Sequence, residues 1–232
     1  TMFGDESRMI RLDMSEYMHP GSASRLLEVG QGVSSLAQRV RQEPLSLVLL
    51  DEIEKADREV LDLLLAILGE GRLSDEEGRL VDFRMTVIVM TSNLGVADGR
   101  GLGFGDGGGD ERATVLRKVR QHFRPELWNR IDHVIPFRAL DRADVLRIVD
   151  LELGKVEART GLTRKHLRLR VTPEARALLA ALGYDPTRGA RPLKRVIEER
   201  VVTPIAAILA ADASYRDREI QVRAEGNELI VG

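Results

Sequence analysis

The sequence predicts an α/β protein with a partial parallel sheet and flanking helices, followed by a smaller α+β unit. Two apolar runs, residues 45–50 and 85–91, have the composition of strands buried on both faces of a parallel sheet. Between them, residues 57–70 carry apolar side chains at helical spacing. A strand, a helix and a second strand joined by short connections form a right-handed parallel unit.

Shorter patterns complete this first unit. Residues 8–14 alternate apolar and polar side chains, as in a short strand, and residues 36–43 have a basic, helical pattern. The glycines and polar residues within 71–84 predict a hairpin. Residues 95–110 contain eight glycines and predict a mobile loop of low complexity.

The pattern changes toward the C-terminus. A helix at about 112–122 is followed by Pro125, which can open a second, short helix, and residues 133–138 are expected to form a strand or an extended exit. We therefore place the domain boundary after residue 139, which gives a large subdomain (1–139) and a small one (140–232). The small subdomain is expected to contain helices at 141–158, 173–182 and 189–211 and a β-rich tail at 217–231.

Composition excludes several classes of protein. The 232 residues carry 35 Lys and Arg against 37 Asp and Glu, so bulk charge does not favour nucleic acid or an anionic membrane as the main partner. The absence of cysteine excludes a disulfide framework, thiol catalysis and Cys-based zinc sites, and it suits a reducing compartment. No apolar run approaches the roughly 20 residues of a membrane span.

The sharpest local signal is the pair Asp51-Glu52, which directly follows the apolar run 45–50. This places carboxylates at the C-terminal edge of a parallel sheet, where ligands of open α/β folds bind. Acids after a strand can also simply begin the next helix, and this short segment alone does not decide between the two. Asn93 follows the neighbouring strand and adds an amide at the same edge.

Longer motifs favour the ligand-binding interpretation, and they occur in order along nearly the whole chain. They are FGDESRMIRLDMSEY (3–17), LLDEIEKA (49–56), GRLSDEEGRLVDFR (71–84), TSNLG (91–95), FRPELWNRID (123–132) and RGARPLKR (188–195). Together they resemble the C-terminal AAA+ module of the Clp/ClpB family of protein unfoldases and disaggregases. The resemblance implies a RecA-like AAA+ sheet and an ATPase that uses ATP and Mg²⁺.

The resemblance also implies roles for particular residues. Asp51 matches the acid that holds Mg²⁺ through water, and Glu52 matches the catalytic glutamate of the Walker B pair. Asn93 matches sensor 1, and Arg191 matches sensor 2 of the small subdomain. Arg130 matches an arginine finger that acts on the ATP of a neighbouring subunit. A finger acting in trans implies a ring of identical subunits, which we expect to be a hexamer.

The sequence departs from the family at the phosphate loop. A Walker A motif needs Gly, four residues, and then Gly-Lys-Ser/Thr. No such motif surrounds any of the lysines, which are Lys55, Lys118, Lys155, Lys165 and Lys194. In the family this loop precedes the FGDE segment, so we expect that these 232 residues lack the phosphate loop and the first core strand. By themselves they are expected to bind ATP poorly and to hydrolyse none.

A second departure lies in residues 19–36, where relatives carry an aromatic-Val-Gly pore loop that grips substrate polypeptide. Val29-Gly30 is present, but no aromatic residue accompanies it and the stretch is about six residues short. Either the loop is truly reduced, which would weaken threading, or residues are missing from this stretch of the sequence as written.

Within the glycine-rich segment, Leu102-Gly103-Phe104 resembles the tripeptide by which some Clp unfoldases dock onto a ClpP-like peptidase. The alternative is a flexible loop with one apolar clamp. We therefore expect a cytoplasmic, ATP-driven unfoldase of polypeptide substrates that either feeds such a peptidase or acts alone, without nucleic acid or membrane as partner. A ClpB-type disaggregase and a remodelling or oligomerisation module with a degenerate pore loop are the alternatives.

Overall fold

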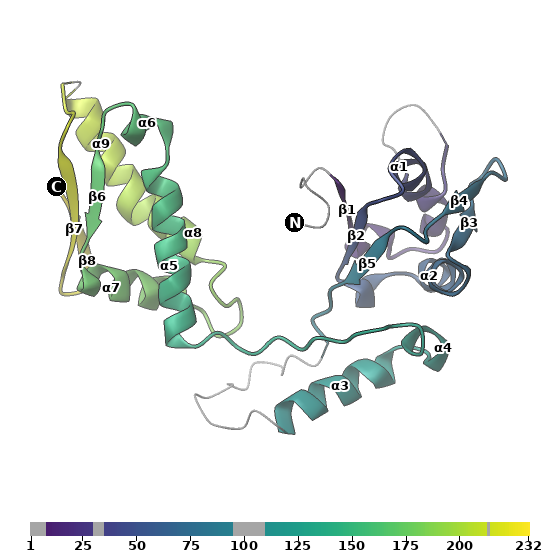
Figure 1. Cartoon of the computed structure of the whole chain (residues 1–232). Helices are drawn as coiled ribbons and strands as arrows, with labels where there is room; N and C mark the ends of the chain where they lie inside the picture. The colour runs from purple at the N-terminus through teal and green to yellow at the C-terminus, as the bar shows by residue number, and fades with distance from the viewer. Residues whose placement is uncertain (1–7, 30–34, 95–109, 213) are drawn as a thin grey trace. The chain divides into compact units, whose positions relative to one another are not determined.

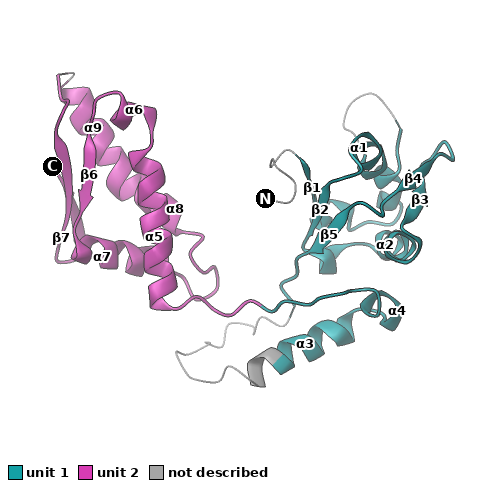
Figure 2. Ribbon diagram, viewed as in Figure 1, with its two compact units in different colours: residues 1–96, 107–136 teal, residues 97–106, 137–232 magenta. Residues whose placement is uncertain are grey.

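The computed structural model describes residues 8–29, 35–94, 110–212 and 214–232. These residues form two compact units, one within residues 1–136 and the other containing residues 137–232 (Figure 2). The units divide between Pro136 and Phe137, whereas the sequence motifs suggest a boundary after residue 139. Each unit has its own buried apolar cluster.

A three-stranded parallel sheet is the centre of the first unit, as the sequence predicts (Figure 1). Its strands are β1 (Met9–Asp13), β2 (Leu47–Asp51) and β5 (Val87–Met90), in the order β1-β2-β5. Asp13 pairs with Asp51 in register, and Leu50 pairs with Met90. The carboxyl ends of the three strands therefore meet at one edge of the sheet, where the site residues follow.

Helices, helical turns and a two-stranded hairpin lie between these strands, and two further helices follow β5. They are η2 (Met14–Tyr17), η3 (Ser22–Leu26), α1 (Leu36–Gln42), η4 (Ile53–Lys55), α2 (Arg58–Glu70), β3 (Arg72–Ser74), β4 (Leu80–Asp82), α3 (Asp110–His122) and α4 (Pro125–Trp128). Asp57 caps the start of α2 by accepting the Glu59 N–H at 2.9 Å, and Gly71 ends it with a φ of 66°. The predicted hairpin is confirmed by the antiparallel pairing of β3 with β4.

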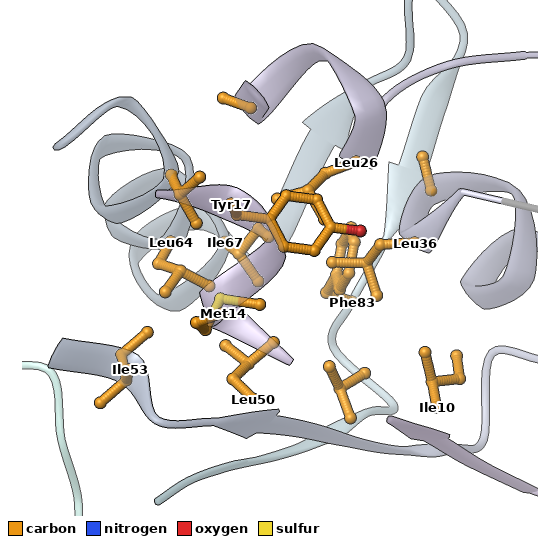
Figure 3. Packing of buried hydrophobic residues seen from close by; sticks show 14 of the residues in the cluster. Ile10, Met14, Tyr17, Leu26, Leu36, Leu50, Ile53, Leu64, Ile67 and Phe83 are labelled. Carbon is orange, nitrogen blue, oxygen red and sulfur yellow. The ribbon is translucent and has the colours of Figure 1, made fainter. Parts of the chain in front are cut away.

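The core of this unit lies on one face of the sheet. Ile10 and Leu50 point from the strands toward Met14, Leu64 and Ile67, which come from η2 and α2 (Figure 3). The buried residues thus alternate along the strands, as a sheet covered on one face requires.

The opposite face is more open, and this corrects the expectation that residues 45–50 and 85–91 are buried on both faces. Val87 and Val89 are each 38% exposed, and Leu47 and Leu49 are half-buried. Among the described residues, the helices contribute their apolar side chains to the single cluster on the other face. An apolar run predicts a strand here but not how many of its faces are covered.

Residues 133–138 follow the second of the two expectations, an extended exit. They have no strand assignment, and Ile135 and Phe137 are 74% and 96% exposed. An extended segment becomes a strand only through hydrogen bonds to a neighbour. No described residue provides such a neighbour here.

The second unit is α+β. Its elements are α5 (Arg142–Glu157), α6 (Thr160–Thr163), β6 (Arg168–Val171), α7 (Pro173–Gly183), α8 (Leu193–Ile197), the π-helical turn η5 (Glu198–Val202), α9 (Thr203–Ala211), β7 (Glu219–Glu225) and β8 (Glu228–Val231). Strand β7 pairs in parallel with β6 and in antiparallel with β8, and Gly226 makes the β7–β8 turn with a φ of 62°. None of the helices in the described ranges combines the length and the apolar character needed to cross a bilayer.

Candidate nucleotide-hydrolysis site

The two acids lie where β2 leaves the sheet. Asp51 is the last residue of β2, and Glu52 takes a left-handed conformation with a φ of 57°. A non-glycine residue in this region costs about 1–3 kcal/mol and persists when its surroundings hold it. Here Thr91 holds it, because its hydroxyl oxygen accepts the Glu52 N–H at 3.1 Å and its carbonyl accepts the Ile53 N–H at 3.0 Å.

The Asp51 carboxylate is held by two donors from the neighbouring strands. The Thr91 hydroxyl donates to Asp51 Oδ1 at 2.5 Å, and Arg11 of β1 lies 2.5 Å from Oδ2. The Asp51 side chain is 25% exposed, so it remains accessible from solvent. This carboxylate is oriented from both sides and faces the open edge of the sheet.

These oxygens fit the way that Mg²⁺ is usually bound beside nucleotides. Within the described residues, no three His, Cys, Asp or Glu side chains converge to form a metal cage. Mg²⁺ in nucleotide sites takes one or two protein carboxylates and completes its shell with waters and substrate phosphates. Asp51, with Glu52 next to it, supplies donors of that kind.

Glu52 and Asn93 meet at the carboxyl edge of the sheet. The Asn93 side-chain amide donates to Glu52 Oε1 at 3.2 Å, and Lys55 forms an ion pair with Glu52 Oε2. The hydrogen bond to Glu52 raises the pKa of Lys55. Both oxygens of the Glu52 carboxylate therefore have a partner that fixes its orientation, and a general base must be held in this way within reach of the water that it activates.

A second acid reaches the same asparagine. Glu54, on the turn η4, accepts the Asn93 backbone N–H at 3.0 Å through Oε1. The segment after β5 is thus joined to the segment after β2 by both main-chain and side-chain hydrogen bonds.

Arg130 belongs to the same unit but lies apart from these acids. It follows the short helix α4, which is fixed to α2 by the buried Leu127 and by an ion pair between Arg124 and Asp62. Its guanidinium lies against Gly69, where an added Cβ would be 2.0 Å from Arg130 Nη1. Arg130 is exposed and forms no ion pair with any described residue.

Arg191 lies in the second unit, in the turn between α7 and α8. Asp185 organises this turn by accepting the N–H groups of Thr187 and Arg188 at 2.8 and 2.9 Å. The hydrogen bond from Thr187 lowers the pKa of Asp185, so the turn keeps its charged acceptor near neutral pH. Gly189 has a φ of 63°, and the exposed Arg191 has no ion-pair partner in the described part of the chain.

Comparison with known proteins gives the family. Residues 1–134 match the family described as the AAA domain (Cdc48 subfamily), and residues 140–222 match the C-terminal, D2-small domain of ClpB protein. The chain belongs to the Clp/ClpB family of AAA+ proteins. It is similar over its whole length to the Chaperone protein ClpB of Pseudomonas putida (44% identical) and of Bacillus cereus (40%), and over 99% to ClpB 1 of Synechocystis (40%). It spans 26–27% of the length of these relatives.

The AAA+ assignment confirms the family and the α/β fold predicted from the motifs. Asp51, Glu52 and Asn93 are brought together at the carboxyl edge of the sheet. Arg130 lies elsewhere in the same unit, against Gly69, and Arg191 belongs to the second unit. Leu102, Gly103 and Phe104, the suggested docking tripeptide, lie outside the described residues, as do residues 30–34 of the suggested pore loop.

Motif matching missed four residues that complete the site. Arg11 and Thr91 bind Asp51, and Lys55 and Glu54 bind Glu52 and Asn93 respectively. The sequence indicated a role for two of these residues only through their positions. Thr91 immediately follows a predicted strand, and Arg11 lies on the strand that pairs with the strand of Asp51. Their roles depend on strand order, which the motifs alone do not specify.

Proposed function

We propose that this chain supplies the metal-binding acid, the catalytic glutamate and the sensor of an ATP-hydrolysis site. The observation that carries the proposal is the 3.2 Å contact between Asn93 Nδ2 and Glu52 Oε1, next to Asp51. A carboxylate and an amide that converge on one point suit the orientation of a water molecule for attack on a phosphate. The Clp/ClpB relationship supports the same assignment.

Each residue then has a defined task. Asp51 would hold Mg²⁺ through its waters, and Glu52 would take the proton of the attacking water. Asn93 fixes the direction of the Glu52 carboxylate and donates to the water or to the γ-phosphate. Bound Mg²⁺ would neutralise charge on the phosphate oxygens.

The arginines complete the site from elsewhere. We propose that Arg130 reaches the γ-phosphate of a neighbouring subunit in a ring, with a hexamer as the expected state. Its exposed guanidinium, which has no acidic partner in the described residues, suits this role. Arg191 is proposed to act as sensor 2. A guanidinium offers paired donors to a phosphoryl group, and a finger of this kind contributes about 10³–10⁵ in rate.

The proposal requires a phosphate loop, and no Gly-x₄-Gly-Lys-Ser/Thr motif occurs in the 232 residues. We therefore propose that the loop is supplied by residues of the protein outside these 232 and that the 232 residues alone do not hydrolyse ATP. The length of the relatives, of which this chain spans about a quarter, supports this.

At the level of the whole protein, we propose a cytoplasmic machine that couples ATP hydrolysis to the unfolding or remodelling of polypeptides. Two forms compete. The relatives carry the name Chaperone protein ClpB, and a ClpB-type disaggregase is consistent with that name, as is an unfoldase. The tripeptide Leu102-Gly103-Phe104 favours docking to a ClpP-like peptidase.

One assay separates these forms. The full-length protein is given ATP and a folded, fluorescent substrate, an aggregated substrate, or the folded substrate with a ClpP-like peptidase. Loss of fluorescence with ATP supports the proposed unfoldase, and no ATP-dependent change in any arm contradicts it. Peptide release that disappears when Leu102 and Phe104 are both changed to Ser supports docking, and recovery of aggregated substrate without peptidase supports the disaggregase.

A further inference from the structure

Glu54 is held in an unusual environment for a carboxylate. Its Oε1 accepts the Asn93 N–H at 3.0 Å, but its Oε2 is buried and has no hydrogen-bond partner among the described residues. The residue as a whole is half-buried in the first turn after the catalytic glutamate candidate. No motif role is assigned to it.

This arrangement is unfavourable for stability alone. A buried carboxylate oxygen without a partner has lost its hydrogen bonds to water and has formed none in the protein. An apolar side chain or a neutral amide would therefore cost less free energy at this position. The compensating feature is the bond to Asn93, since a backbone N–H binds a charged carboxylate more strongly than a neutral acceptor. The carboxylate thus has one strong interaction in the structure, and that interaction is directed at Asn93.

The consequence concerns where the Asn93 side chain lies. Asn93 is the third residue after β5, and Thr91 fixes the start of this segment through its N–H to the Leu50 carbonyl at 3.0 Å. Glu54 fixes the main chain of Asn93 itself, two residues further on. With both points held, the Asn93 amide group is placed 3.2 Å from Glu52 Oε1.

We propose that Glu54 is a positioning residue for ATP hydrolysis, acting through the main chain of Asn93 to hold its side-chain amide against Glu52. The inference rests on the proposed function of this site. Lys55 pairs with Glu52, which offsets the repulsion between the two nearby carboxylates. Glu54 itself does not touch the reacting groups.

The chain offers a matched control. Glu59 also accepts a distant backbone N–H through its carboxylate, from Gly21 at 2.9 Å, but it is exposed and lies outside the site. Glu54→Met removes the acceptor with little change in length, and Glu54→Gln keeps an acceptor oxygen. Glu59→Ala removes a comparable hydrogen bond elsewhere in the same unit.

The test uses the full-length protein and two readouts, steady-state ATP hydrolysis and hydrogen–deuterium exchange of the peptide that contains Asn93. Glu54→Met is expected to lower kcat about tenfold with the KM for ATP within about twofold, and to speed exchange at Asn93. Glu54→Gln is expected to keep most of the original kcat and most of the protection of Asn93 from exchange. Glu59→Ala is expected to change neither kcat nor exchange at Asn93. A Glu54→Met protein with unchanged kcat and exchange overturns the proposal, as does Glu54→Gln being as impaired as Glu54→Met.

Different results would contradict the proposed function of the site and not the role of Glu54. If the unsubstituted protein shows no ATP hydrolysis, or if Glu52→Gln hydrolyses ATP normally, the assignment of the site itself is wrong. The exchange readout does not depend on turnover, so it reports on the Glu54–Asn93 contact in either case. Where Glu54→Met does not fold, Glu54→Ala also removes the acceptor and takes its place beside Glu59→Ala, and unchanged kcat and exchange in Glu54→Ala overturn the proposal.

Discussion

Thr91 donates its hydroxyl proton to Asp51 Oδ1 at 2.5 Å while the same oxygen accepts the N–H of Glu52 at 3.1 Å. A single hydroxyl, on the residue that directly follows β5, thereby orients Asp51 at the end of β2 and holds the main chain of Glu52 after it. The side chains that carry the proposed chemistry are placed by a residue that no motif role singles out.

Thr91→Val keeps the shape of the side chain and removes this hydroxyl. We expect the free energy of unfolding to fall by about 2–3 kcal/mol, because the hydrogen bond to the Asp51 carboxylate and the one from the Glu52 N–H are both lost. In the full-length protein, the Mg²⁺ concentration needed for half-maximal ATP hydrolysis should rise, because Asp51 is no longer oriented. Urea unfolding and a Mg²⁺ titration of turnover measure the two effects.

Thr86→Val is the matched control for this substitution. The Thr86 hydroxyl donates to the Phe83 carbonyl at 2.7 Å, away from the acids. Thr86→Val should lower the free energy of unfolding by about 1 kcal/mol, because one bond to a neutral carbonyl is lost, without changing the Mg²⁺ requirement. An equal change in Mg²⁺ requirement in both variants would show that Thr91 has no special relation to Asp51.

Arg130 gives a prediction about assembly. Mixing Arg130→Ala subunits with unsubstituted ones should lower ATP hydrolysis faster than in proportion to their fraction, because each altered subunit impairs its neighbour's site. Arg117→Ala, an exposed arginine on α3 bonded to the Thr114 hydroxyl, is the control and should have no effect. A strictly proportional loss with Arg130→Ala would exclude a finger acting in trans.

Two helical glycines in the second unit give a prediction about the fold that presents Arg191. A Cβ at Gly183 would lie 2.8 Å from the Leu193 backbone, so α7 and α8 approach each other too closely for a side chain there. Gly183→Ala should therefore lower the free energy of unfolding by about 1–3 kcal/mol. At Gly154 nothing lies within 4 Å of the added Cβ, and Gly154→Ala should raise stability by up to about 1 kcal/mol.

Denaturant unfolding of the two glycine variants decides this prediction. Opposite signs for Gly183→Ala and Gly154→Ala are expected. A neutral Gly183→Ala would mean that the α7–α8 contact is looser than the structure shows, and that the turn carrying Arg191 is not held by it.

Much of the fold could be predicted from local patterns. The runs 45–50 and 85–91 predicted two strands, and the spacing of apolar residues predicted α2. Strand β6 was missed because only four residues, Arg168–Val171, form it and its pairing partner β7 begins at Glu219. The prediction that both faces of the sheet are covered was also wrong, because coverage depends on where the helices pack and not on the sequence of the strands.

The site was predicted only as far as its motifs extend. Asp51, Glu52 and Asn93 follow strands and match family motifs, so they could be placed at one edge. Thr91 and Glu54 could not be assigned, since their bonds to Asp51 and Asn93 join residues 40 and 39 positions apart. Such contacts depend on strand order and on the conformation of the loops, which no local pattern encodes.

The central claim is that Glu52 is the residue that activates water for ATP hydrolysis. The most direct measurement is steady-state ATP hydrolysis and ATP binding by the full-length protein with Glu52→Gln, which keeps the size of the side chain and the hydrogen bond to Asn93. We expect hydrolysis to fall by about 10²–10⁴ while ATP binding is kept, because only the base is lost. Hydrolysis at the rate of the unsubstituted protein would contradict it.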